Sequence, residues 1–323
     1  MAGASRLTAP QRQEKDVHMT TETHLPTETT TYVGRPRFEG ANIRTWIGFK
    51  HFTYLMEEGV LQYLRDRDLG PTKLYRDFGL GVEFVDSSIQ LPNTIDLDDE
   101  VKVQVTRDER KLGWAFSVRM TVDRGDGPIT VLNGKTRVQL IHEVDTTPRS
   151  SVPETVAEAV SEITSLDTTG PQTLAQLKSE DPNTFLWSWR IPYFYCHYSL
   201  RLQHSGYVRA VEEVVDRFLF DRGLAIEEVL AERGWIPVVS RSRITLLEDA
   251  LMGETLHTVM RVDEVIKDVM YPAKIDMYVE RGGTLFHTAT ASVVHGYAVS
   301  RGTEAGTLAT FDDETRTKLL GGR

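Results

Sequence analysis

The chain has 323 residues, of which 40% are hydrophobic and 26% charged, and its formal net charge is −10 at pH 7. This length accommodates two domains of ordinary size, and the composition is that of a globular protein. The acidic balance, without a dense Lys/Arg cluster, argues against a nucleic-acid partner. The single cysteine, Cys196, excludes an internal disulfide. No apolar run approaches the ~20 residues of a membrane span, and no signal-peptide pattern opens the chain. We therefore expect a cytoplasmic protein without a membrane partner.

The first half of the chain changes its hydrophobic period once. Residues 1–31 are rich in Thr, Glu, Gln and Pro, which predicts a disordered tail. Within residues 32–144, Met56, Val60, Tyr63 and Leu64 recur at helical spacing, and Gly70-Pro71 follows as a stop signal. Beyond this helix the period becomes 2, as in the run 101–105. The pattern predicts long antiparallel strands with one buried face.

The second half repeats this order. Residues 145–185 are rich in Thr, Ser and Pro and predict a linker with a short helix at 154–163. A helix and alternating strands return over residues 186–301. The last segment, 302–323, is mostly polar, and we expect it to be loose.

The two predicted helices share one sequence pattern. Gln203–Leu224 aligns with Gly48–Leu69 at a constant offset of 155, and seven of the 22 positions are identical. A fixed offset over this length indicates an internal duplication. Because each copy exceeds 100 residues, the chain is predicted to be a fused pair of domains.

A long helix followed by long antiparallel strands, present twice, resembles the hotdog fold. In that fold an antiparallel sheet wraps around a central helix. Tyr207-Val-Arg-Ala-Val-Glu-Glu213 is similar to the helix of 4-hydroxybenzoyl-CoA-type and enediyne-type polyketide thioesterases, and Tyr195-Cys-His-Tyr-Ser-Leu-Arg201 occupies the position of the loop before it. The resemblance implies an α+β protein of two fused hotdog domains. It also implies binding of an acyl-CoA or acyl-carrier-protein thioester between the halves and hydrolysis without a cofactor, with bacterial polyketide biosynthesis as the expected setting. Two oligomeric states are compatible with the resemblance: a monomer that acts as a pseudo-dimer, and a homodimer of double hotdogs.

The resemblance also gives candidate catalytic positions. The loop position of the family falls on Asn42 and His197, and the acidic helix position falls on Glu57 and Glu212. On a helical wheel both acids lie at the rim of the apolar stripe. Thioester hydrolysis needs a base or nucleophile and donors for the developing oxyanion. We therefore expect two unequal clefts, with His197 and Glu57 as the working acid/base pair and Asn42 with Glu212 as an oxyanion-type site.

Five further residues are candidates for substrate binding. Arg44 and Arg201 lie near the helix starts, where they can meet a phosphate or an acyl carboxylate; the other three are Tyr195, His204 and His51. Each candidate also has a purely structural interpretation, such as a solvated helix face or a hydrogen-bonded histidine. No metal-ligand spacing appears. The alternative functions are a hotdog dehydratase, hydratase or cyclase, an acyltransferase, and a non-catalytic acyl-binding protein.

Overall fold

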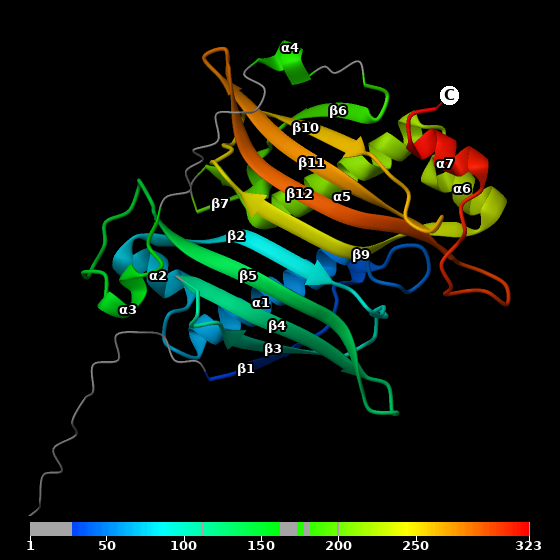
Figure 1. The fold of residues 1–323 in the computed structure, drawn as a ribbon. Coiled ribbons are helices and arrows are strands. Elements are labelled where there is room, and N and C mark those ends of the chain that lie inside the picture. The colour runs from blue at the N-terminus through cyan, green and yellow to red at the C-terminus, as the bar shows by residue number, and fades with distance from the viewer. Residues whose placement is uncertain (1–27, 112, 162–172, 178–180, 199, 323) are drawn as a thin grey trace, which may run out of the picture.

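Ten strands of the chain form one antiparallel sheet in a computed structural model that describes residues 28–111, 113–161, 173–177, 181–198 and 200–322 (Figure 1). A short hairpin, β7–β8, makes a separate two-stranded sheet. The strands are β1 (Thr30–Gly34), β2 (Leu80–Gln90), β3 (Val101–Arg107), β4 (Trp114–Asp123), β5 (Pro128–His142), β6 (Thr184–Arg190), β7 (Cys196–His197), β8 (Arg201–Leu202), β9 (Trp235–Leu246), β10 (Thr255–Val262), β11 (Met270–Arg281) and β12 (Thr284–Val299). The α-helices are α1 (Phe49–Arg65), α2 (Pro71–Phe78), α3 (Glu154–Ala157), α4 (Leu174–Leu177), α5 (His204–Asp221), α6 (Ile226–Arg233) and α7 (Asp313–Leu319); the 3-10 turns are η1 (Phe38–Gly40) and η2 (Tyr193–Tyr195).

The strand order shows that the sheet consists of two equivalent halves. One half runs β1-β3-β4-β5-β2, and the other continues as β9-β12-β11-β10-β6. Equivalent elements begin 155 residues apart, as in α1 and α5 (204 − 49) and in β2 and β9 (235 − 80). The halves join edge to edge through the antiparallel pair β2–β9, in which Asp86 lies opposite Thr245. The prediction of an α+β protein with two fused hotdog domains is confirmed.

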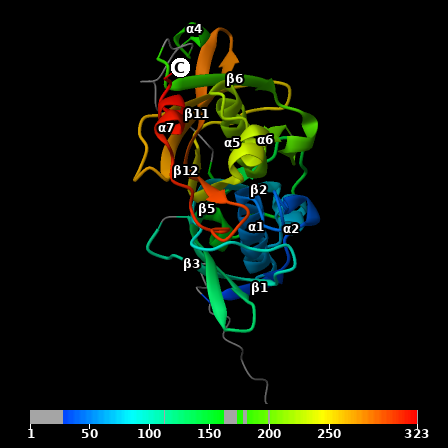
Figure 2. The same ribbon diagram turned by 90° about the vertical axis from the view of Figure 1, so that its right-hand side faces the viewer.

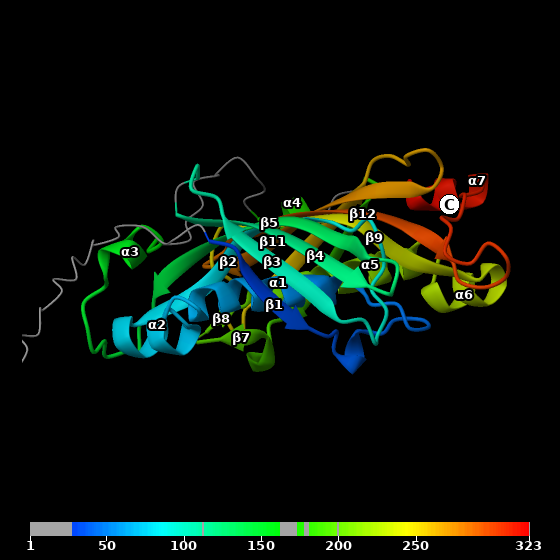
Figure 3. The same cartoon turned by 90° about the horizontal axis from the view of Figure 1, so that it is seen from below.

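Both long helices lie on the same face of the sheet, each against its own half (Figures 2 and 3). In the first half, Met56, Val60, Tyr63 and Leu64 of α1 are completely buried against alternate residues of the strands. Burial of one such side chain contributes about 1.5–3 kcal/mol. Helix α5 packs into a second hydrophobic core in the same way. Among the described residues, no helix is long and apolar enough to cross a membrane.

The segments at the domain boundaries differ from their predictions. Strand β1 starts at Thr30, two residues inside the predicted tail, whose residues 1–27 lie outside the described ranges. In the linker, the predicted helix 154–163 is a single turn, α3, and its last two positions lie outside the described residues. The expectation of a loose C-terminus is wrong. Helix α7 is capped by Asp312 and buries Leu319 in the second core together with Phe311, because these apolar side chains complete that core.

Candidate active site

The amino-terminal end of α5 meets α1 at a chain of three side chains drawn from both halves. Glu57 of α1 lies 2.6 Å, through Oε1, from Nδ1 of His204, the first residue of α5. On the other side of the ring, His204 Nε2 lies 2.9 Å from Oγ of Ser87 on β2. A His204 tautomer with its proton on Nδ1 donates to Glu57 and accepts from the Ser87 hydroxyl. The three groups therefore fix one another's orientation across the junction of the halves.

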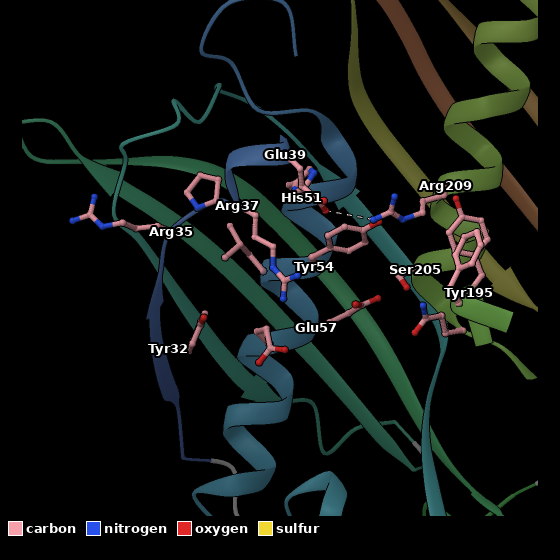
Figure 4. A pocket seen from close by; sticks show the side chains of 15 residues that line it. Tyr32, Arg35, Arg37, Glu39, His51, Tyr54, Glu57, Tyr195, Ser205 and Arg209 are labelled. Carbon is pink, nitrogen blue, oxygen red and sulfur yellow. Dashed lines mark ion pairs between the residues drawn. The ribbon is translucent and has the colours of Figure 1, made fainter. Parts of the chain in front are cut away.

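Of these three residues, only Glu57 lines the adjoining cleft. The side chain of His204 is 3% exposed and that of Glu57 is 18% exposed, while Ser87 is buried. The cleft has a volume of about 730 Å³ and runs between α1, the start of α5 and the segment after β1 (Figure 4). Its lining consists of Tyr32, Arg35, Pro36, Arg37, Glu39, His51, Tyr54, Leu55, Glu57, Glu58, Phe194, Tyr195, Gln203, Ser205 and Arg209. Because Oε1 is engaged by the imidazole, Glu57 can offer its second oxygen to a molecule in this space.

The first turn of α5 provides hydrogen-bond donors beside Glu57. The N-cap residue Gln203 makes no side-chain capping bond, and its carbonyl accepts from the backbone N–H groups of Gly206 and Tyr207. The two preceding N–H groups, of His204 and Ser205, have no acceptor inside the helix by geometry. Since Gln203 and Ser205 line the cleft, this helix end can stabilise a negative oxygen there.

The symmetry-related acid has a different partner. Glu212 of α5 pairs with Lys50 of α1 at 2.5 Å, so an ammonium ion takes the place of the imidazole. Asn42 is exposed, and its side chain lies over the N-cap Gly48, where an added Cβ would come within 3.0 Å of it. Arg44 is also exposed, with a left-handed φ of 72°. Asn42 thus lies at the start of α1, as expected, but among the described residues no hydrogen bond joins it to Glu212.

The second acid of each pair lies at the surface, as expected. Glu58 pairs with Arg65, and Glu213 pairs with Arg217 one helical turn away. Each of these carboxylates is 46% exposed, against 18% for Glu57 and 34% for Glu212. The wheel argument therefore identified the more shielded acid in both helices.

His197 bonds to an acid other than the expected one. Its Nε2 lies 2.7 Å from Oε1 of Glu83 on β2, a carboxylate that is only 1% exposed. Burial opposes protonation of the ring, but Glu83 outweighs it and raises the pKa of His197 above its usual value; Glu57 adds to the rise. The β7–β8 turn, with Tyr198 at φ 55°, directs His197 towards β2. His197 is thus within electrostatic reach of Glu57 but does not hydrogen-bond to it.

Arg201 belongs to the same ion cluster. Its Nε lies 3.4 Å from Glu83, and its Nη2 pairs with Glu143 directly after β5. The Arg201 side chain is 9% exposed, and its guanidinium, from the second half, is paired with two carboxylates of the first half. This arrangement does not fit the expected role of Arg201 in meeting a substrate anion. A Cβ added at Gly81 would meet the Glu143 carboxylate oxygen, so a larger residue there would require this side chain to shift.

Two of the three remaining predicted binding residues, Tyr195 and His51, reach the cleft wall. Arg209 lies 5.7 Å from the ring centres of Tyr195 and Tyr54. His51 is 2% exposed and packs under Gly40, where an added Cβ would stand 2.7 Å from the imidazole. His204 does not line the cleft and instead orients Glu57. Cys196 has a pKa raised by burial, which does not suit a thiolate nucleophile.

Sequence reasoning missed Ser87, Glu83, Glu143 and Arg209. The first three lie on or next to strands whose register only the folded sheet defines. Glu83 alone carried a signal, because an acid within the apolar run Leu80–Val85 suggests a buried partner. Among the described residues, no group of three or more His, Cys, Asp or Glu side chains could hold a metal ion.

The paired halves, with a cleft at the ends of their central helices, define a double hotdog protein. No protein-family sequence model and no curated protein sequence matches the chain. Solved structures do match it. One described as an oleoyl thioesterase from Lactobacillus plantarum has a TM-score of 0.56 at 10% identity, covering 84% of this chain and 95% of that one. A 12:0-ACP thioesterase from Umbellularia californica gives 0.55 at 11% identity, with 83% and 94% covered. An acyl-ACP thioesterase from Bacteroides thetaiotaomicron gives 0.53 at 12% identity, with 83% and 97% covered. At these identities the similarity establishes the shared fold.

Proposed function

We propose that the protein hydrolyses an acyl thioester of CoA or of an acyl carrier protein, with Glu57 as general base. One observation carries this proposal: a carboxylate of one half is held by a histidine at the helix start of the other half and faces a cleft. The structural neighbours are described as an oleoyl thioesterase, an acyl-ACP thioesterase and a 12:0-ACP thioesterase, which supports the same reaction class here.

The geometry suits an attack by water. Glu57 Oε1 stays bound to His204, and Oε2 takes a proton from a water molecule as that water attacks the thioester carbonyl. The backbone N–H groups of His204 and Ser205 stabilise the oxyanion that forms. Collapse of this intermediate expels the thiolate, which receives the proton from Glu57. The products are one free acid and one thiol, and Glu57 is regenerated.

The two acidic positions are unequal for this chemistry. His204 holds Glu57 through a ring hydrogen bond, and Ser87 fixes that ring from behind. Glu212 instead forms a direct ion pair with Lys50 and does not line the cleft. We therefore assign the reaction to Glu57 and a supporting role to Glu212.

A dehydratase remains the second candidate, because one observation favours it. His204 and Glu57 come from different halves and touch, as a dehydratase that sets a histidine against an acid requires. However, His204 is 3% exposed and does not line the cleft. In a dehydratase both the histidine and the acid must reach the substrate, but here only Glu57 can do so. Hydrolysis therefore fits the site better.

Product analysis separates the two functions. Purified protein is incubated with a panel of acyl-CoA and acyl-carrier-protein thioesters, including 3-hydroxyacyl thioesters, and the products are identified by mass. We expect free acid and thiol in equal amounts; loss of water from an intact thioester would mean dehydration. A single turnover in H₂¹⁸O then tests the role of Glu57. Label in the released acid after the first turnover supports general base catalysis, whereas unlabelled acid would mean that Glu57 attacks directly.

Three wider expectations stay predictions beside this proposal. Polyketide biosynthesis would be supported by neighbouring polyketide synthase genes, and a cytoplasmic location by cell fractionation. Light scattering of the purified protein decides between a monomeric pseudo-dimer and a homodimer.

A further inference from the structure

Three arginines and three glutamates line the cleft beside Glu57, and one of the arginines is unpaired among the described residues. Each carboxylate that lines it has a partner: Glu57 bonds to His204, Glu58 pairs with Arg65, and Glu39 pairs with Arg209 at 3.5 Å. Among the lining cations, Arg35 pairs with Glu100. The Arg37 side chain has no ion pair or hydrogen bond within the part of the chain that the structure describes. Its guanidinium points into the cleft beside Tyr54 (Figure 4).

His51 adds an unsatisfied polar atom to the same wall. The residue is 2% exposed, and its buried Nε2 has no hydrogen-bond partner among the described residues. Burial, followed by the charge of Lys50, lowers the pKa of this imidazole to about 4, and Arg209 and Arg37 contribute in the same direction. The ring is therefore neutral at pH 7 and can donate one N–H. A buried polar atom left without a partner costs about 1–3 kcal/mol, and a ligand recovers this cost when a small displacement of the wall brings the ring to it.

His51, Arg37 and Arg209 therefore surround one part of the cleft. Both arginines act electrostatically on His51, so each lies within Coulombic reach of it. Arg209 also lies between the rings of Tyr54 and Tyr195 at 5.7 Å from each, which limits its movement. Guanidinium groups and a neutral imidazole N–H suit a carboxylate, whose oxygens accept several hydrogen bonds.

The distance from Glu57 selects the part of the substrate that can reach this position. His51 precedes Glu57 by six residues on α1, or about 9 Å along the helix axis. A pantetheine arm separates its phosphate from the thioester by roughly four peptide-residue lengths, on the order of 15 Å when extended. With the thioester at Glu57, an anion at His51 is thus more readily part of a short acyl group than the pantetheine phosphate.

Building on the proposed function, we propose that His51, Arg37 and Arg209 bind a carboxylate at the far end of the acyl group. The preferred substrate is then a short dicarboxylic acyl thioester. This preference differs from that expected of a long saturated chain, for which charged groups in the acyl site would be unfavourable.

The test compares two acyl groups of equal length. Glutaryl-CoA and pentanoyl-CoA differ only in the terminal carboxylate. We expect kcat/KM to favour glutaryl-CoA at least tenfold. Arg37→Gln, at an exposed position that does not endanger folding, should lower the glutaryl value about ten- to hundredfold and the pentanoyl value less than twofold. Arg241→Gln, at an exposed arginine of β9 outside the cleft lining, is the matched control and should change neither.

Two further arms identify the source of the anion and separate this inference from the hydrolytic function. The same thioesters on pantetheine, which lacks the phosphate, should keep the glutaryl preference and its sensitivity to Arg37→Gln. If Arg37→Gln instead weakens both acyl-CoAs equally and the pantetheine thioesters not at all, the cations bind the phosphate and the inference is wrong. Calorimetry with the thioethers S-(4-carboxybutyl)-CoA and S-pentyl-CoA measures binding without turnover. Carboxylate-selective binding in a protein that hydrolyses nothing upholds the inference and rejects the hydrolase, whereas equal binding of both thioethers overturns the inference.

Discussion

Replacement of Arg201 by methionine tests whether the ion cluster holds the two halves together. The guanidinium comes from the β7–β8 hairpin of the second half, and it lies between two carboxylates of the first half that are each 1% exposed. Loss of one partner from a buried ion pair typically costs about 3–5 kcal/mol, because the remaining charge stays away from water. We expect Arg201→Met to lower the free energy of unfolding by about this amount. Urea denaturation followed by tryptophan fluorescence and by circular dichroism measures the change.

Arg243→Met provides the matched control at the same junction. Arg243 pairs with Asp86 across β2 and β9, but its side chain is 60% exposed, and such surface pairs contribute about 0–1 kcal/mol. The double variant Arg201→Met, Glu83→Gln should regain part of the lost stability, since it removes one uncompensated charge. Equal stability losses in Arg201→Met and Arg243→Met would refute the claim that this buried cluster fastens the halves.

Three other predictions concern single residues. His204→Gln should reduce kcat about ten- to hundredfold and change its pH profile, while KM stays within a factor of two, because the His204 side chain orients Glu57 and does not touch substrate; an unchanged pH profile would argue against this role. The folded-state pKa of His51 is lowered to about 4 by burial and by Lys50, so its contribution to stability is present above pH 6.5 and is lost as the pH falls from 6.5 towards 4. Between pH 7 and pH 4.5 the free energy of unfolding should therefore decrease by on the order of 2 kcal/mol more in the wild type than in His51→Gln. Equal decreases in the two proteins would contradict this role of His51. Leu319→Ala should lower the free energy of unfolding, measured by urea denaturation, by about 2–5 kcal/mol. A loss below about 0.5 kcal/mol would mean that α7 is not part of the core.

The fold could be predicted from the sequence because its helices and strands follow the period of the hydrophobic residues. The repeated stripe of α1 and α5, the change to alternating strands and the constant offset all act through local geometry. The same reasoning placed Glu57 and Glu212 at the rim of their helices. Predictions made from local patterns also failed where a long-range contact decides, as for α7, whose polar sequence hid the contribution of Leu319 to the second core.

The candidate site was predicted only in part, because its contacts cross the junction of the halves. Glu57 was identified correctly as a shielded acid, but the histidine that touches it is His204 and not His197. The two histidines are seven residues apart, and only the folded structure shows that His197 bonds to Glu83 on β2. Ser87 and Glu83 are separated from their histidine partners by more than 100 residues. No local pattern encodes contacts over such separations.

Turnover of Glu57→Gln beside Glu212→Gln tests the central claim most directly. Both substitutions replace a carboxylate by an amide of the same shape at equivalent positions of the two helices, so they compare the acid held by His204 in the cleft with the acid paired to Lys50. Since a general base contributes about 10²–10⁴-fold to the rate, Glu57→Gln should lower kcat by at least a hundredfold. Glu212→Gln should lower it less than fivefold. Full turnover in Glu57→Gln, or the larger loss in Glu212→Gln, would contradict the assignment of Glu57 as the reacting carboxylate.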